Sequence, residues 1–289
     1  MTAAIATSNS RAACVSRRWR IAVTFAVAVA GLLGPARTVA QPLDEFSMRV
    51  GGFVTHLDTT IRADDPSGRR GTEVDFEREL GLDDRDVIEF IGMAWRPWRR
   101  HEFGLNYFHE TLSGGRRLER ELVFRGELFE VNAAVYSALT LESFEFHYTY
   151  WAYMSERLAL GLRLGHLDYR IATRIEVLAS DSDDPLQPRL RVTTSNTIPA
   201  PSIGIDLNVA LAEKWRFNAS VGWLEADLDR VSPLITTARA GLEYLAWERV
   251  GVWADFALNR VRADYRGDTL GGKIEIREGG LRLGVTYRL

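Results

Sequence analysis

The sequence lacks the features that identify most disulfide-linked, helical membrane or catalytic proteins. It contains one cysteine in 289 residues, Cys14, which lies near the start of the chain. After Leu33 no apolar run approaches the ~20 residues that a membrane-spanning helix needs. A G-x-S-x-G elbow, a phosphate-binding glycine loop and an H-E-x-x-H motif are all missing. These absences exclude a disulfide framework, a helical span and the enzyme classes that carry those motifs.

The first forty residues have the organisation of a cleaved secretory signal peptide. A basic region is followed by a thirteen-residue apolar run, 21–33, and then by small residues up to Ala40. That order predicts cleavage after Ala40, and the apolar run is too short to cross a bilayer. We therefore expect a removed signal peptide at 1–40 and one large β domain at 41–289. Cys14 leaves with the signal peptide, so the mature chain has no thiol for a disulfide or a metal, and we expect no cofactor and no metal.

The mature chain is acidic. Residues 1–40 hold five arginines and no acid, so the remainder has 31 basic against 39 acidic residues and a net charge of −8. Binding to nucleic acid depends on clustered lysine and arginine that neutralise phosphates. We therefore expect no nucleic-acid partner.

Residues 143–165 carry the clearest structural pattern in the chain. Aromatic residues occupy every second position of the first arm, 143–150, and leucine occupies every second position of the second arm, 158–164. Side chains of a strand point alternately to opposite faces, whereas apolar residues of a helix recur at intervals of three and four. The stretch is therefore predicted to be a β-hairpin with one apolar face.

The same period of two recurs along the mature chain and predicts ten strands. They cover residues 46–61, 86–95, 101–111, 143–150, 158–178, 203–211, 215–223, 234–245, 250–261 and 281–289. The connections after the second, fourth, sixth and eighth strands are tight turns, and the other connections are long and polar. This alternation is typical of outer-membrane barrels. The predicted fold class is all-β: a transmembrane antiparallel up-and-down β-barrel of about ten strands, with short periplasmic turns and long extracellular loops.

Three of the long connections have features of their own. The first contains a stretch, 71–80, where Val74 and Phe76 suggest a short extra hairpin. The second, 112–137, is rich in charge and is predicted to be a protruding hairpin. The third, 179–188, is predicted to be a loop, because its prolines do not fit a central strand.

Tryptophan marks the short turns. Each of the four turns has at least one nearby, and together these residues are Trp95, Trp98, Trp151, Trp215 and Trp247. Indole prefers the membrane interface, where its ring is apolar and its N–H stays hydrated. These five residues therefore predict a periplasmic aromatic girdle and indicate that the apolar face of the strands meets lipid.

The opposite face of the strands carries charges of both signs. Its charged residues include Glu145, Arg163, Asp206, Arg216, Arg239, Glu243, Asp255 and Arg282. A lumen filled by ion pairs needs both signs. The predicted lumen network consists of Glu145, His147, Arg163, Asp206, Arg216 and Arg239. Ten strands enclose a bore that side chains can largely fill, so the pattern leaves open whether the lumen conducts.

The last strand carries a family resemblance. It ends Val285-Thr286-Tyr287-Arg288-Leu289, apolar at every second position to the final residue. With the signal peptide and the ten alternating strands, it resembles the outer-membrane β-barrel proteins of Gram-negative bacteria, although their usual final residue is aromatic. The stretch 74–84 is similar to one in a group of uncharacterised small barrels, which implies no activity. The resemblance implies an outer-membrane location, with outer-membrane lipid, lipopolysaccharide and the barrel-assembly machinery as partners.

One constellation outside the lumen is a candidate site. His109, Glu142, His166 and Asp168 have the lipid-facing parity and lie about nine to twelve residues up their strands from the periplasmic turns, near the outer interface. If the register allows, two imidazoles and two carboxylates converge there. They form either an ordinary polar rim, a general base for lipid hydrolysis, or a divalent-ion site that bridges lipopolysaccharide phosphates.

Two functions are compatible with these patterns. The first is a non-enzymatic outer-membrane barrel with a structural, surface-interaction or narrow-channel role. The alternative is an outer-membrane hydrolase acting on lipid or peptide at the extracellular rim, because a family of ten-stranded surface proteases exists and a fold does not fix a function.

Overall fold

The computed structural model of the protein describes residues 41–65, 67, 69–83, 85–178, 188–225, 231–265 and 271–289. The predicted signal peptide and residues 179–187 of the third long connection lie outside the described residues. The described residues form β-strands, and no helix among them is long and apolar enough to cross a membrane. The strands are β1 (Phe46–Ala63), β2 (Glu73–Asp75), β3 (Arg85–Trp98), β4 (His101–Arg117), β5 (Leu122–Phe124), β6 (Glu127–Phe129), β7 (Ala134–Met154), β8 (Leu158–Leu178), β9 (Pro188–Ala212), β10 (Trp215–Glu225), β11 (Val231–Leu245), β12 (Val250–Tyr265) and β13 (Gly272–Arg288).

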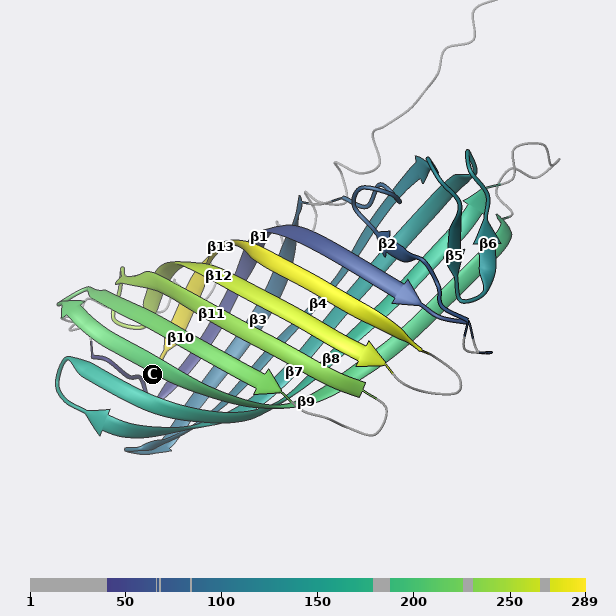
Figure 1. The fold of residues 1–289 in the computed structure, drawn as a ribbon. Coiled ribbons are helices and arrows are strands. Elements are labelled where there is room, and N and C mark those ends of the chain that lie inside the picture. The colour runs from purple at the N-terminus through teal and green to yellow at the C-terminus, as the bar shows by residue number, and fades with distance from the viewer. Residues whose placement is uncertain are drawn as a thin grey trace, which may run out of the picture.

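The ten long strands close into a barrel (Figure 1). Each of β1, β3, β4 and β7 to β13 pairs antiparallel with the next long strand, and β13 pairs back onto β1. The closing register runs from Ser47 opposite Arg288 to Ala63 opposite Gly272. The predicted all-β, ten-stranded antiparallel barrel is confirmed.

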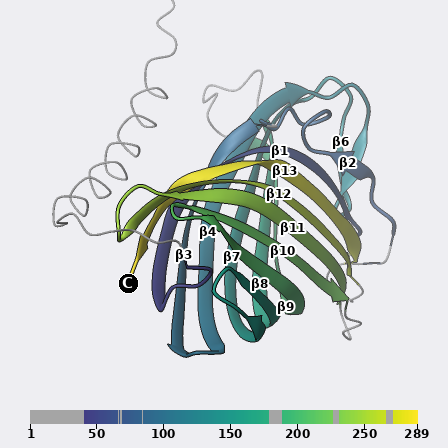
Figure 2. The same ribbon diagram turned by 90° about the vertical axis from the view of Figure 1, so that its left-hand side faces the viewer.

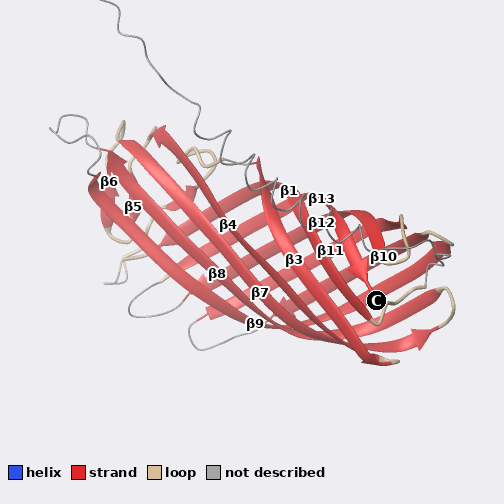
Figure 3. Cartoon of the chain, turned by 180° about the vertical axis from the view of Figure 1, so that it is seen from behind, coloured by secondary structure: helices blue, strands red, loops and turns tan. Residues whose placement is uncertain are grey.

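The two ends of the barrel differ (Figures 1 and 3). At one end, turns of two to four residues join β3 to β4, β7 to β8, β9 to β10 and β11 to β12. The C-terminus lies at this short-turn end, where the carbonyl of Leu289 accepts hydrogen bonds from the amides of Glu45 and Phe46, each at 3.2 Å. The opposite, long-loop end carries β2, β5 and β6.

The outer face of the barrel is apolar in a continuous belt. Figure 2 shows the strands curving round so that one face of each points outward. Large apolar side chains on this face are 39–56% exposed, namely Val54, Ile91, Leu105, Phe144, Phe146, Leu160, Leu162, Leu164, Ile203, Ile205, Val221, Leu242, Phe256, Leu258, Leu281 and Leu283. Every barrel strand contributes at least one of them. So large an apolar surface is suited to lipid and not to water, and the predicted outward orientation of the 143–165 hairpin is confirmed.

The interior at the long-loop end is an apolar core closed by a cap, which we define as residues 73–83 together with the β5–β6 hairpin. Phe76 and Phe124 are both 0% exposed, and their rings meet edge to face with centroids 6.4 Å apart. The first long connection does not form the separate hairpin that was predicted. Instead β2 adds to β1, with residues 73–75 opposite residues 60–62, because Val74 is then buried against the core.

The strands continue beyond their predicted ends at the long-loop end. β9 begins at Pro188 and not near Ile203, and its first half pairs with β8, whereas its pairing with β10 begins only at Ile203. Proline cannot donate to a ladder, so Pro199 and Pro201 fit where β9 has a neighbour strand on one side. Residues 193–197 are polar on both faces, which is why alternation did not reveal this extension.

The structure corrects the prediction for Trp151. The other four girdle tryptophans, Trp95, Trp98, Trp215 and Trp247, are 44–63% exposed, and their membership of a membrane-interface girdle stays a prediction. Trp151 is 1% exposed and lies inside, where its indole N–H donates to Glu102 at 3.2 Å. Strict alternation places Trp151 on the inward face with His147. A β-bulge after Trp151 then brings Tyr153, which is 53% exposed, to the outer face.

A charge placed in the apolar belt tests whether this belt faces lipid. Leu162→Arg is expected to lower the free energy of unfolding in phospholipid vesicles by about 2–4 kcal/mol, because a guanidinium replaces leucine in hydrocarbon. Urea titration of the vesicle-embedded barrel measures the loss. Leu128, on β6, is similarly exposed but lies in the cap. Leu128→Arg is the control and should change stability by under ~0.5 kcal/mol; equal losses in both variants would contradict the assignment.

The cap is expected to weaken as pH rises, because of Glu77. Its Oε2 accepts a hydrogen bond from the amide of Thr59 at 2.8 Å, yet burial raises the pKa of Glu77 from 4.5 to about 7. A carboxyl whose folded pKa is raised stabilises the fold while protonated, so its contribution is complete below about pH 4.5 and is lost as pH rises through about 7. Hydrogen-exchange protection of the Phe76 amide, which donates to Thr59, should therefore fall between about pH 5 and about pH 8. Glu77→Gln keeps an acceptor without a charge and should show little fall; an equal fall in this variant would exclude Glu77 as the cause.

Candidate functional site

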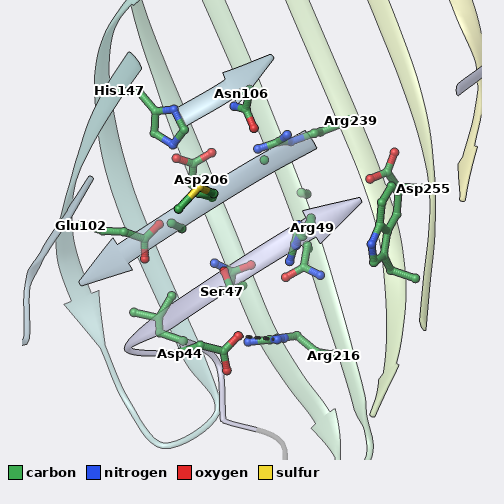
Figure 4. A pocket seen from close by; sticks show the side chains of 18 of the residues that line it. Asp44, Ser47, Arg49, Glu102, Asn106, His147, Asp206, Arg216, Arg239 and Asp255 are labelled. Carbon is green, nitrogen blue, oxygen red and sulfur yellow. Dashed lines mark hydrogen bonds and ion pairs between the residues drawn. The ribbon is translucent and has the colours of Figure 1, made fainter. Parts of the chain in front are cut away.

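The interior at the short-turn end is held by an ion-pair network centred on Arg216 (Figure 4). Arg216 donates through Nε to Glu243 at 2.9 Å. Through Nη2 it donates to Asp44 at 2.8 Å, the contact drawn in Figure 4. Arg288 donates to the second oxygen of Asp44 at 3.1 Å, and Arg49 lies 3.6 Å from Glu243. The side chains of Arg216 and Glu243 are 3% and 0% exposed. Each buried charge therefore has the opposite charges that its burial requires.

The segment that precedes β1 enters the barrel mouth. The carbonyls of Gln41 and Pro42 each accept a hydrogen bond from Nη1 of Arg216 at 3.4 Å. Leu43 is 5% exposed and packs in a small cluster with Trp151. Residues 41–44 therefore plug the short-turn mouth and bring Asp44 to the network.

A second polar layer lies deeper in the barrel. Arg163 on β8 is 3.6 Å from Asp206 on β9, and Nδ1 of His147 on β7 is 4.0 Å from Glu145. The imidazole of His147 occupies the space over Gly104, since a Cβ at that position would lie 2.1 Å from Nε2 of His147. Glycine on β4 thus makes room for the histidine opposite it.

Two further arginines divide the interior into two cavities. Arg282 on β13 forms a bidentate pair with Asp255 on β12 (2.6 and 2.7 Å), and its guanidinium lies 5.0 Å from the ring centre of Phe90. Nε of Arg239 donates to Ser220 at 2.6 Å. A cavity of about 120 Å³ lies toward the short-turn end and one of about 160 Å³ toward the long-loop end, and the arginines line both.

The polar half ends at Glu278 on β13. This side chain is buried, and its two oxygens accept hydrogen bonds from the Tyr169 hydroxyl at 2.9 Å and from the Asn259 amide at 3.1 Å. Beyond this layer the interior is a single cluster of buried apolar residues that includes Leu139, Ile171 and many others up to the cap. The interior therefore changes from ion pairs to hydrocarbon along its length.

The structure brings the predicted lumen residues together in separate groups. Glu145 lies with His147, Arg163 with Asp206, Arg216 with Asp44 and Glu243, and Arg239 with Ser220. Sequence reasoning missed Asp44, which precedes the first periodic strand. It also missed Glu278, because the predicted last strand began at residue 281. Had that strand been extended, the even spacing between Glu278 and inward-facing Arg282 would have placed Glu278 inside.

The four predicted rim residues do not form one site. All four face outward, and His166 is bonded to Asp168 at 3.2 Å. His109 is opposite Glu142 in the ladder, but Glu142 accepts a hydrogen bond from the Tyr107 hydroxyl at 3.2 Å and lies 3.8 Å from Arg170. Among the described residues, no group of three or more His, Cys, Asp or Glu side chains is arranged to hold a metal ion.

A closed ten-stranded antiparallel barrel with an apolar belt, a charged interior and short turns at one end has the fold of the outer-membrane β-barrel proteins. In that class the short turns face the periplasm and the long loops face outward. The sequence matches no family model and no curated protein.

Among solved structures, the outer membrane protease OmpT from Escherichia coli is similar, with a TM-score of 0.57 and 13% identity over 87% of this chain and 99% of that chain. The Yersinia pestis attachment invasion locus protein Ail has a TM-score of 0.35, at 10% identity, with 86% of this chain and 100% of that chain covered. The Pseudomonas putida toluene transporter TodX has a TM-score of 0.36, at 10% identity, with 89% and 94% covered. At 13% identity the likeness to OmpT is one of fold alone.

Removal of Arg216 tests the mouth network. Arg216→Met leaves the buried Glu243 with Arg49, which is more distant, as its remaining positively charged neighbour. We therefore expect the free energy of unfolding to fall by about 3 kcal/mol. The double variant Arg216→Met/Glu243→Leu removes both charges and should recover a large part of this loss. Urea unfolding in vesicles measures both, with Arg69→Met, at an exposed position between β1 and β2, as a control of near-zero effect. Equal stability of the single and double variants would show that the two charges are not coupled.

Proposed function

We propose that the protein is a closed outer-membrane barrel with a structural or surface-interaction role, and that it is not a channel. The observation that carries this proposal is that side chains fill the barrel interior at both ends, with ion pairs at the short-turn end and apolar residues at the long-loop end. A solute would have to displace an ion-pair network at one end and an apolar core at the other.

The periplasmic mouth supports the proposal through its burial. Two backbone carbonyls of the plug at 41–44 accept hydrogen bonds from Arg216, and Trp151 behind the plug is 1% exposed. Displacing the plug would leave Asp44 and Arg216 without their mutual contact in a site of low polarity, which costs several kcal/mol.

The outer half supports the proposal through its packing. Leu139, Leu141 and Phe124 are 0% exposed, and they belong to one apolar cluster that joins the barrel wall to the cap. Interiors packed in this way contain few voids that hold water, so ions have no hydrated path through this half.

The cap offers a surface for contacts outside the cell. Leu128 on β6 is 52% exposed, and Val131, two residues after the end of β6, is 46% exposed, whereas Phe124 and Phe129 of the same hairpin are buried. Exposed apolar side chains on and beside a protruding hairpin favour a role in surface interaction.

The hydrolase alternative has one contact in its favour. In the His166–Asp168 pair, a histidine that could act as a general base lies within hydrogen-bonding distance of a carboxylate that could orient it. The pair faces outward beside the apolar belt. The other two predicted members, His109 and Glu142, do not join it. The likeness to OmpT adds no activity to this chain, because it concerns the fold.

Single-channel recording tests the proposal. The purified barrel in planar bilayers is expected to give no discrete openings, and deletion of residues 41–44 should still give none, because the apolar core blocks the outer half. A general porin reconstituted in parallel is the positive control. Discrete openings by the intact protein would contradict the proposal. Turnover of lipid or peptide that is lost in His166→Ala would favour the hydrolase instead.

A further inference from the structure

The outer face of β12 and β13 changes abruptly from apolar to basic at the top of the belt. Leu258 and Leu281 are the last large apolar side chains on the outer face of these strands, 51% and 44% exposed. On β12 the next outward position is Arg260. On β13 Gly279 comes next, opposite Leu258, and Arg277 follows it, opposite Arg260; Arg262 is then opposite Glu275. Two residues of a strand span ~7 Å, so these side chains lie directly above the hydrocarbon, at headgroup depth.

Three guanidinium groups on this face share one carboxylate. Nη2 atoms of Arg260, Arg262 and Arg277 lie 3.0, 3.1 and 2.8 Å from the same Glu275 oxygen, Oε1. Lys273 reaches the other oxygen at 3.8 Å. The three arginines are 40–55% exposed while Glu275 is 13% exposed, so the cations are open to the membrane side and the acid is beneath them.

The acids around this cluster do not balance its charge at headgroup depth. Asp58 on β1 lies 4.0 Å from Arg277, at the limit of an ion pair. Asp264 faces Lys273 in the ladder, nearer the loops, and Arg62 there pairs with its own Asp64 at 3.0 Å. Three arginines packed on one carboxylate repel one another, and the repulsion falls when a further anion joins them.

The opposite side of the barrel has no such excess. On β7 and β8 the outward charges about as far from the short turns are one arginine, Arg170, and two acids, Glu142 and Asp168; farther out on β8 and β9, Arg174 and Arg191 lie near Glu176. Here Glu176 lies 2.6 Å from Arg191 and 3.9 Å from Arg174. The balanced face shows that a basic cluster is not a general property of this rim.

We propose that Arg260, Arg262 and Arg277 form a binding site for the phosphate groups of the phosphorylated glycolipid of the outer leaflet, lipopolysaccharide. Guanidinium binds phosphate with paired, charge-assisted hydrogen bonds, and exposed Nη groups on neighbouring strands offer several such pairs to one phosphate. The acyl chains of the same lipid lie against the belt residues Leu258 and Leu281. The site depends on the outer-membrane location but not on whether the lumen conducts, so the recording experiment and this proposal fail independently.

Lipid binding by the full mature barrel in bicelles tests the proposal. The probes are phosphorylated lipid A, the same lipid A after removal of its phosphates, and inorganic phosphate, with a chelator present to exclude bridging by divalent ions. The protein is expected to bind phosphorylated lipid A at least about tenfold more tightly than the dephosphorylated form, the difference that one charge-assisted hydrogen bond supplies.

Matched variants locate the effect. The triple variant R260Q/R262Q/R277Q should lose this preference, whereas R170Q/R174Q/R191Q, with the same change of charge on the opposite side of the barrel, should keep it. Circular dichroism checks that both keep their strand content, and the single variant R277Q replaces the triple variant if the latter fails to fold. Equal binding of the two lipid A forms, an unchanged preference in the cluster variant, or binding of inorganic phosphate as tight as that of lipid A would each overturn the proposal.

Discussion

The pairing of β13 with β1 is the constraint on which the rest of the structure depends. Hydrocarbon offers backbone N–H and C=O groups no partner, so a sheet in a membrane must close on itself. The closing ladder runs the whole length of both strands, from Ser47 opposite Arg288 to Ala63 opposite Gly272. Closure gives every strand an inner and an outer face. Whether a residue is at an odd or an even position in its strand then decides whether its side chain meets lipid or the barrel interior.

Closure also creates an interior that must be filled. The barrel fills its two halves in different ways: buried charges that compensate one another lie near the periplasmic mouth, and an apolar core lies under the cap. Glu278, bonded to Tyr169 and Asn259, marks the change between them. A segment before the first strand completes the lower half with Asp44, and segments between strands complete the upper half with Phe76 and Phe124.

Alternation predicted the parts of the fold that touch lipid and failed where both faces have the same polarity. It gave the 143–165 hairpin and the ten strands, because lipid on one side and charge on the other enforce a period of two. It missed the outer extension of β9, where residues 193–197 are polar on both faces. The prediction for Trp151 was wrong because it rested on the nearness of this residue to a turn. The alternation along β7 puts Trp151 on the inner face, beside Glu102.

The sequence by itself determined the class of fold, the outward face of each strand and the identity of most charges that point inward. These follow from local chemistry, since a strand in a membrane leaves no choice of face. Only the tertiary structure decided which charges meet. Arg216 meets Asp44 from far along the chain, three arginines gather on Glu275, and His166 pairs with Asp168 while His109 lies opposite Glu142. Contacts of that kind depend on ladder register and on the packing of segments outside the strands, neither of which the period of a sequence contains.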